Sequence, residues 1–196
     1  MIILFGLAGS GKSTQGNILA EKYGWRWLSV GQVLRDTGRF DQTLREGGLV
    51  DDNEVIRLMN KEIQRADDDG IDVILDGYPR DEYQAKWVAE NMADRIDGAI
   101  WIKISKEELW KRIELRGRED DTKDAVERRF KVVEQNICSI SNLLKAKNVQ
   151  IVEVDGFGKL DEVTERLSAE IEKMMPEAMV QENDVNDKND EKSYGE

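Results

Sequence analysis

The sequence predicts an α/β fold in which helices cover both faces of a central, parallel sheet of five strands. Short apolar runs alternate along the chain with stretches of helical periodicity, the pattern that parallel sheets with helical crossovers produce. The runs Ile2–Leu4 and Val73–Leu75 are continuously apolar, as expected for strands that are buried on both faces. The five strands are expected at Ile2–Phe5, Arg26–Ser29, Val73–Asp76, Ala99–Ile104 and Gln150–Val154.

A helix is expected after each of these strands. The helix after the fourth strand has a capping box, because Ser105 stands at the N-cap position and Glu108 follows three residues later. The crossover between the second and third strands is long, and residues 30–72 contain several short helical patterns, including Asp52–Ala66. We expect this crossover to hold an inserted helical lobe.

The composition limits the class of protein. A chain of 196 residues suits one domain, and its hydrophobic fraction of 39% is enough for a core. The net charge of −12 argues against a broad nucleic-acid-binding surface, because phosphate backbones require clustered Lys and Arg. No stretch approaches the roughly 18 to 20 apolar residues of a membrane span, and the N-terminus has no secretion signal. We therefore expect a cytoplasmic protein that binds neither nucleic acid nor membranes.

The chain has one cysteine and no histidine. Cys138 cannot form an internal disulfide, and we expect it to pack as a small apolar residue on a helix. Any general base or metal ligand must come from Asp, Glu, Lys or hydroxyl groups, which excludes Ser-His-Asp catalysis and argues against structural zinc.

The last segment, residues 176–196, differs in composition from the domain, residues 1–175. It contains seven acidic and two basic residues and few large apolar side chains. Such a segment cannot bury enough surface to fold alone. We expect an acidic disordered tail, which would serve solubility or weak interaction with a partner.

Residues 6–14 carry the most specific motif of the chain. They read Gly-Leu-Ala-Gly-Ser-Gly-Lys-Ser-Thr and fit the P-loop pattern G-x-x-x-x-G-K-[ST] between a strand and a helix. Glycines let the backbone curl so that N–H groups point at a polyphosphate, and the helix start adds the positive end of its dipole. Lys12 supplies a charge for the outer phosphates, and Ser13 supplies a hydroxyl for Mg²⁺. This predicts a three-layer P-loop fold whose nucleotide-binding residues include Gly9, Ser10, Gly11, Lys12, Ser13 and Thr14.

The third strand ends in a second polar motif, Asp76-Gly77-Tyr78-Pro79-Arg80. An aspartate at the carboxyl end of a strand beside the P-loop strand can orient Mg²⁺ or its waters. Gly77 allows close approach of the backbone, and Arg80 offers a bidentate clamp for a phosphate.

Further arginines follow the fourth strand, at positions 112, 116, 118, 128 and 129. Several guanidinium groups that converge on the strand ends can neutralise a phosphoryl group in transfer. The alternative is that they form surface ion pairs with Glu119, Asp120 and Asp121, which would contribute little.

Taken together, these motifs resemble those of nucleoside monophosphate kinases, and among them the adenylate kinase family. The resemblance extends from Met1 to about Met174. It rests on motifs in a fixed order: Gly6–Gln15, Leu28–Arg35, Gly47–Val50, Leu75–Arg80 with Gln84, and the group Arg116, Arg118, Asp120, Asp121 and Arg129.

The resemblance implies reversible transfer of the terminal phosphoryl group of Mg·ATP to AMP, giving two ADP, in a monomer. ATP would lie on the P-loop, with Lys12 at its outer phosphates and Arg116 helping to hold it. AMP would lie under a small helical lobe, residues 30–60, with its phosphate on Arg35 and Arg80. Arg118 and Arg129 would reach the transferring group when a short lid, residues 116–124, closes. Further substrate contacts are implied for Ser29, Val50, Gly77 and Gln84.

Gln84 is the residue that the resemblance implies for reading the base. An amide donates and accepts at once, which matches the ring nitrogen and amino group of adenine. Related pyrimidine monophosphate kinases carry Asn at this position, so Gln84 favours AMP.

The chain departs from the family pattern at four places. Gln32 stands where Asp is usual, which leaves Asp76 alone near the metal and predicts weaker organisation of Mg²⁺. Val30 replaces Thr or Ala beside the base, and Gly48 replaces a common Lys. The segment Gly117–Thr122 is very short and has no cysteine pair, which excludes a zinc-bearing lid and predicts some ATP hydrolysis.

Two other functions stay open at this point. The first is a UMP/CMP kinase or another small-molecule kinase on the same scaffold. The second is a nucleotide-binding regulatory protein with little turnover, which the loss of an acid at Gln32 and the short lid would favour. A GTPase switch fits poorly, because Asn60-Lys61-Glu62 lacks the Asp that would read guanine.

Overall fold

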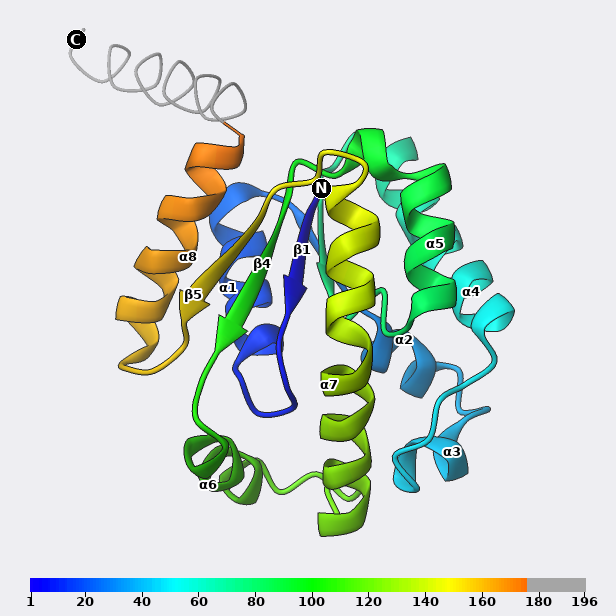
Figure 1. The fold of residues 1–196 in the computed structure, drawn as a ribbon, viewed down its shortest axis with the longest axis vertical. Coiled ribbons are helices and arrows are strands. Elements are labelled where there is room, and N and C mark those ends of the chain that lie inside the picture. Colours follow the sequence, from blue (N-terminus) through cyan, green and yellow to red (C-terminus); the bar gives the residue numbers. More distant parts are fainter. Residues whose placement is uncertain (176–196) are drawn as a thin grey trace, which may run out of the picture.

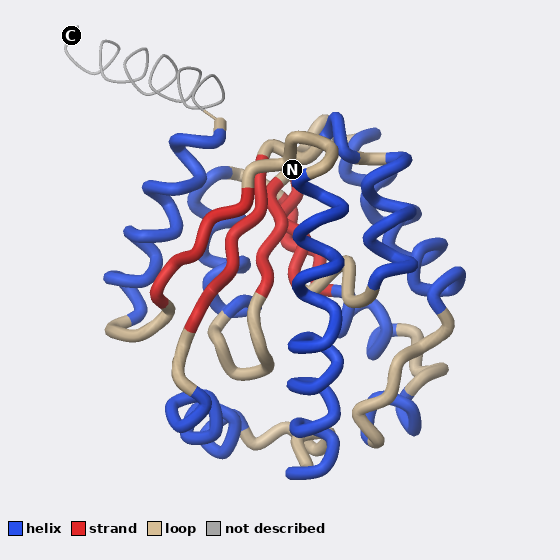
Figure 2. Tube along the Cα trace, in the orientation of Figure 1, coloured by secondary structure: helices blue, strands red, loops and turns tan. Residues whose placement is uncertain are grey.

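The computed structural model describes residues 1–175 and confirms the α/β class. Five strands form one parallel sheet in the order β2-β3-β1-β4-β5, so the P-loop strand is central (Figure 2). The first three strands have the expected bounds, and the last two are displaced by one residue. The strands are β1 (Ile2–Phe5), β2 (Arg26–Ser29), β3 (Val73–Asp76), β4 (Gly98–Lys103) and β5 (Ile151–Asp155).

Helices cover both faces of this sheet and complete the three layers (Figure 1). They are α1 (Lys12–Tyr23), α2 (Val30–Asp36), α3 (Asp41–Arg45), α4 (Asp52–Asp68), α5 (Glu82–Asn91), the 3-10 turn η1 (Ala93–Arg95), α6 (Lys106–Arg116), α7 (Lys123–Lys145) and α8 (Leu160–Met174).

Alternation along β1 builds the two halves of the core. Ile2 and Leu4 pack in one apolar cluster with side chains of α1 and α8. Ile3 and Phe5 point to the opposite face, where α4, α5 and α7 supply the cluster. Because successive side chains of a strand face opposite ways, a strand covered on both sides must be apolar throughout. All four residues of β1 are buried, in agreement with the sequence-based expectation.

The long crossover between β2 and β3 is helical, as expected. It contains α2, the five-residue α3 and α4, which runs two residues beyond the expected end at Ala66. The strands point toward α3, α6 and the first half of α7, which lie beyond their carboxyl ends (Figure 1). These elements therefore surround the edge of the sheet at which α/β proteins bind ligands.

Helix α6 and the start of α7 form a hairpin held by Leu109, Ile113, Val126 and Phe130. Gly117 ends α6 in the left-handed conformation at φ 59°, which glycine adopts without strain. Thr122 caps α7 by accepting a hydrogen bond from the Ala125 N–H at 3.3 Å. Only residues 117–122 separate the two helices.

Two local expectations need correction. Ser105 caps α6, accepting from the Glu108 N–H at 3.3 Å, but the Glu108 carboxylate bonds Arg112 one turn along at 3.0 Å, so only half of the capping box forms. Cys138 lies on α7 as expected but is exposed, so it does not pack as a core residue. No helix in the described part of the chain has the length and apolarity that crossing a bilayer requires. The expected acidic tail lies outside the described residues.

Candidate active site

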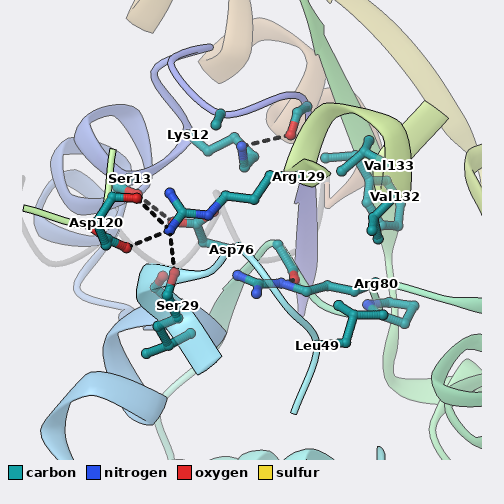
Figure 3. A pocket seen from close by; sticks show the side chains of 18 of the residues that line it. Lys12, Ser13, Ser29, Leu49, Asp76, Arg80, Asp120, Arg129, Val132 and Val133 are labelled. Carbon is teal, nitrogen blue, oxygen red and sulfur yellow. Dashed lines mark hydrogen bonds and ion pairs between the residues drawn. The ribbon is translucent and has the colours of Figure 1, made fainter. Parts of the chain in front are cut away.

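One cavity at the carboxyl ends of the strands collects most of the charged residues that the sequence singled out. Lys12, Arg80 and Arg129 reach into it from the P-loop, the segment after β3 and helix α7 (Figure 3). Six cationic side chains and two carboxylates line it, in a chain whose net charge is −12. A local excess of positive charge in an acidic protein indicates an anion site. The cations are Lys12, Arg35, Arg80, Arg116, Arg118 and Arg129, and the carboxylates are Asp76 and Asp120.

The P-loop bends between β1 and α1 as the motif predicts. Gly9 and Gly11 have φ values of 84° and 95°, a region in which side chains other than glycine are strained. A Cβ on Gly9 would also lie 2.9 Å from the Leu109 carbonyl oxygen, so the loop fits under α6 only without a side chain there. Helix α1 then begins at Lys12, with no side chain capping its first N–H groups. The loop therefore presents free backbone donors and a helix N-terminus to an anion.

Lys12 lies across this loop. Its Nζ donates to the carbonyl oxygens of Gly6 at 2.7 Å and Leu7 at 2.9 Å. Burial lowers its pKa to about 8, and the nearby arginines, including Arg80, act in the same direction, while Asp76 opposes them. The ammonium is thus short of negative charge, which a bound phosphate would supply.

Ser13 and Asp76 form the oxygen pair of the site. The Ser13 hydroxyl donates to Asp76 Oδ2 at 2.7 Å, and Asp76 is 3% exposed at the end of β3. Within residues 1–175, no three His, Cys, Asp or Glu side chains gather closely enough to hold a metal by themselves. One carboxylate and one hydroxyl still fit Mg²⁺, which prefers oxygen ligands and commonly takes the rest from substrate phosphates and water.

Arg35 and Arg80 meet over Gly31. A Cβ on Gly31 would lie 3.4 Å from a terminal nitrogen of each guanidinium, so this glycine leaves the room that both need. Arg80 is held by a hydrogen bond from its Nε to the Gly77 carbonyl oxygen at 3.0 Å. Burial lowers the pKa of Arg80 to about 10, with Arg129 and Arg35 acting the same way against Asp76. Two guanidinium groups side by side form a phosphate clamp.

Two of the arginines around the α6–α7 connector are held by aspartates. Asp121 accepts from Arg116 at 2.8 and 2.7 Å and from Arg129 at 3.0 Å. Arg129 also bonds Asp120 at 2.7 Å. The Asp121 side chain is 3% exposed, so these are not the weak surface pairs considered as an alternative.

Arg118 differs from Arg116 and Arg129, because its side chain makes no hydrogen bond or ion pair with any described residue. Burial lowers its pKa, and Arg116 and Arg35 add to the effect. A half-buried cation that forms no ion pair with a described residue, at the wall of a cavity, is available to a ligand.

We expect Asp121→Asn to loosen this arrangement. The change removes the carboxylate charge that three N–H groups share, which weakens the hold on Arg116 and one of the contacts that fix Arg129. Stability should fall by about 1–3 kcal/mol, and kcat should fall about tenfold, measured by thermal melting and steady-state kinetics. Asp124→Asn, in the exposed first turn of α7, is the matched control. Equal effects of the two variants would contradict the role assigned to Asp121.

The helical insertion also contacts the start of α7. Arg129 donates to the Leu44 carbonyl oxygen at 2.8 Å, and Arg128 donates to that of Glu46 at 2.9 Å. A Cβ on Gly47 would lie 2.5 Å from the Ala125 carbonyl oxygen, so the two backbones touch. The insertion is therefore closed over the cavity.

The structure gathers most, but not all, of the proposed site residues. Ser29, Gly77, Ser13 and Asp76 line the cavity with the cations, whereas Thr14 is exposed beside it. Val50 and Gln84 are buried and do not line it; Gln84 is 1% exposed.

Sequence reasoning missed several lining residues. The role of Gly31 becomes visible only in the structure, where Arg35 and Arg80 occupy the space that a side chain would fill. The apolar wall comes from Trp101, Val132, Val133 and Ile137. For the three of these residues that lie on α7, the only hint in the sequence is their spacing along the helix.

Comparison with known proteins identifies the family. The family model described as adenylate kinase matches residues 4–149. The adenylate kinase of Maricaulis maris is 35% identical over 186 residues, covering 87% of this chain and 98% of the relative. That of Thermus thermophilus is 32% identical, covering 86% and 95%, and that of Agrobacterium fabrum is 33% identical, covering 88% and 97%. With its P-loop, paired arginines and five-stranded parallel sheet, the chain belongs to the adenylate kinase family of nucleoside monophosphate kinases.

Proposed function

We propose that this site transfers the terminal phosphoryl group of Mg·ATP reversibly to AMP, giving two ADP. The observation that carries the proposal is the convergence of six cationic side chains on one cavity beside the Ser13–Asp76 pair. Family membership supports the same reaction. That the enzyme is a cytoplasmic monomer stays a prediction from the sequence.

The donor would occupy the P-loop side of the cavity. The free N–H groups at the start of α1 and the Lys12 ammonium would hold its phosphates. Arg116, fixed by Asp121, would add a second positive charge on this side. Ser13 and Asp76 would hold Mg²⁺, directly or through water. Bound there, the ion would neutralise charge on the phosphate oxygens.

The acceptor would occupy the side of the cavity closed by residues 30–60, which we assign as the lobe that binds the monophosphate. Arg35 and Arg80 would clamp its phosphate, with Ser29 and Gly77 beside them at the strand ends. Gln84 would read its base, and Val50 would pack near it.

Catalysis in this arrangement needs no general base and no covalent intermediate. The site would place the two nucleotides in line and cancel the charge that spreads over the transferring group. Arg118 and Arg129 also line the cavity, and Arg118 forms no ion pair with a described residue that it would have to give up. We assign residues 116–124 as the lid, which carries Arg118, whereas Arg129 follows it on α7. Because the lid is so short, slow ATP hydrolysis without acceptor is expected.

The test is a steady-state assay of ADP formation from Mg·ATP with AMP, UMP, CMP or GMP, and with no acceptor. AMP-dependent turnover well above the no-acceptor rate is expected. Preference for UMP or CMP would overturn the assignment of the base, and no turnover with any acceptor would overturn the proposed function.

Asp76→Asn is expected to raise the Mg²⁺ concentration for half-maximal rate about tenfold, because the site keeps one oxygen ligand and loses its negative charge. The fold should survive, since asparagine can still accept from Ser13. The measurement is a Mg²⁺ titration at fixed nucleotide. Asp72→Asn, exposed at the opposite end of β3, is the control. An unchanged titration curve would remove Asp76 from the metal site.

A further inference from the structure

The amide of Gln84 is held on both sides by the protein. Its Oε1 accepts from the backbone N–H of Arg80 at 3.0 Å, and its Nε2 donates to Asp52 Oδ1 at 2.8 Å. Gln84 stands in the first turn of α5, whereas Asp52 opens α4 in the lobe. The second bond therefore crosses from the body of the enzyme to the lobe.

These two partners admit only one orientation of the amide. A backbone N–H can only donate, and an ionised carboxylate can only accept. Turning the amide over would bring Nε2 against the Arg80 N–H and Oε1 against the Asp52 carboxylate, so both hydrogen bonds would become repulsive contacts. Leaving buried polar groups unsatisfied in this way is unfavourable, so the turned amide is disfavoured.

Asp81 supports Asp52 in this position. Its Oδ1 caps α5 by accepting from the Gln84 N–H at 2.9 Å, while its Oδ2 is buried without a partner among the described residues. The Asp52 carboxylate lies near enough for its charge to act on Asp81. Burial raises the pKa of Asp81 to about 6, and Asp52 acts in the same direction, so Asp81 takes up a proton more readily than an ordinary aspartate does. A proton on Asp81 would donate to Asp52.

A fixed amide distinguishes two classes of purine. An amide has two N–H groups and two acceptor lone pairs, so one of each remains after the bonds to Arg80 and Asp52. Along its pairing edge, adenine presents an amino donor and then a ring-nitrogen acceptor. Guanine and hypoxanthine present an acceptor and then a donor, which is the reverse order. An amide that could turn over would match either edge, and one that is locked matches one.

We propose that Asp52 is a specificity-determining positioning residue, which holds the Gln84 amide in the orientation that fits adenine and opposes 6-oxopurines. The proposal rests on the proposed function, because it concerns the base of the acceptor. The amide is 1% exposed, so its remaining N–H and lone pair meet the base only after neighbouring groups move aside. Asp52 fixes, before the base binds, which side of the Gln84 amide donates a hydrogen bond and which side accepts one.

The test compares wild type with Asp52→Asn, using AMP, IMP and GMP as acceptors at saturating Mg·ATP. Asparagine keeps the size of the side chain but can donate as well as accept, so the turned amide becomes tolerated. The ratio of kcat/KM for AMP to that for IMP should fall about tenfold or more. The change should come from a higher KM for AMP and a lower KM for IMP, with kcat for AMP kept within about threefold. Asp52→Ala, which removes the clamp, should lower the ratio as well.

Asp51→Asn is the matched control. Asp51 is the neighbouring carboxylate at the same helix end, where it caps α4 by accepting from the Glu54 N–H at 3.1 Å. The control removes the same charge without touching Gln84, and it should leave the AMP/IMP ratio unchanged. Thermal melting of both variants shows whether the fold is kept.

The outcomes separate this inference from the proposed function. Wild type that uses no monophosphate would overturn the proposed function. Wild type that prefers AMP, together with an Asp52→Asn variant as selective as Asp51→Asn, would overturn the role of Asp52 alone. Wild type that uses AMP and IMP equally would overturn it too, because the locked amide would then not be selecting.

Discussion

Arg80→Ala is expected to lower kcat/KM for AMP by about 10²–10³-fold. The Arg80 guanidinium lies in the cavity beside Arg35, on the side we assign to the acceptor phosphate. A lysine at this position would restore a point charge without the fork that holds two phosphate oxygens. Arg80→Lys should therefore recover only a small part of the loss.

The fold should not suffer from this change. The variant loses the one hydrogen bond that the Arg80 side chain makes, to the Gly77 carbonyl oxygen. The bond from residue 80 to Gln84 is kept, because the backbone N–H donates it. Its lowered pKa also indicates that the charged group is held at a cost, which alanine removes. We expect a melting temperature equal to or above that of wild type.

The matched control is Arg65→Ala. Arg65 is exposed on α4, where it pairs with Glu62 at 2.7 Å, and it does not line the cavity. Its kinetic constants should equal those of wild type. If Arg80→Ala kept near-normal rates with AMP, the acceptor phosphate would have to bind elsewhere.

The sheet could be predicted because each of its strands is coded locally. A strand buried on both faces needs a continuous apolar run, and Ile2–Leu4 and Val73–Leu75 provide it. Strand order could not be derived in the same way, since it depends on which runs pair across the chain. The P-loop reduced this freedom by marking β1, and Asp76 could be placed beside it on that basis alone.

The individual side chains of the site could be named from their sequence, but not their partners. Arg116, Arg118 and Arg129 look alike in sequence, yet Asp121 holds the first and last and leaves the middle one without a counter-ion among the described residues. That difference arises from the turn of the α6–α7 connector, which composition does not reveal. Surface ion pairing was therefore a reasonable alternative, and only the burial of Asp121 decides against it.

Gln84 illustrates the same limit. The resemblance to the family implies that Gln84 reads the base, and its amide is fixed by two hydrogen bonds. Its clamp by Asp52 joins residues 32 positions apart and depends on how α4 meets α5. No local pattern predicts such a contact.

Lys12→Met is the second change with a large expected effect, and it should separate activity from stability. Methionine keeps the length of the side chain but removes the ammonium that would meet the outer phosphates of ATP. We expect kcat to fall by about 10²–10³-fold, because an electrostatic contact to the transferring group is lost. The Kd for Mg·ATP should rise less, since the backbone donors of the P-loop remain.

Stability should change in the other direction. The folded-state pKa of Lys12, about 8, lies below its ordinary value of 10.5, so the unfolded chain binds more protons between these values. Burial of the ammonium therefore costs stability below about pH 8, and the cost is relieved as the pH rises toward 10.5. Lys12→Met removes this cost, so the free energy of unfolding at pH 7 should be equal to or above that of wild type. Its rise in wild type between pH 8 and 10 should be smaller in the variant.

The same pKa predicts a pH profile for activity. In free wild-type enzyme the ammonium deprotonates above about pH 8, so kcat/KM for ATP should decline there. In Lys12→Met the residual kcat/KM should show no such decline. A variant that is both inactive and strongly destabilised would mean that Lys12 serves the fold through its bonds to the Gly6 and Leu7 carbonyl oxygens. Loss of activity with stability kept would mean that the chain carries this buried charge for the phosphates it binds.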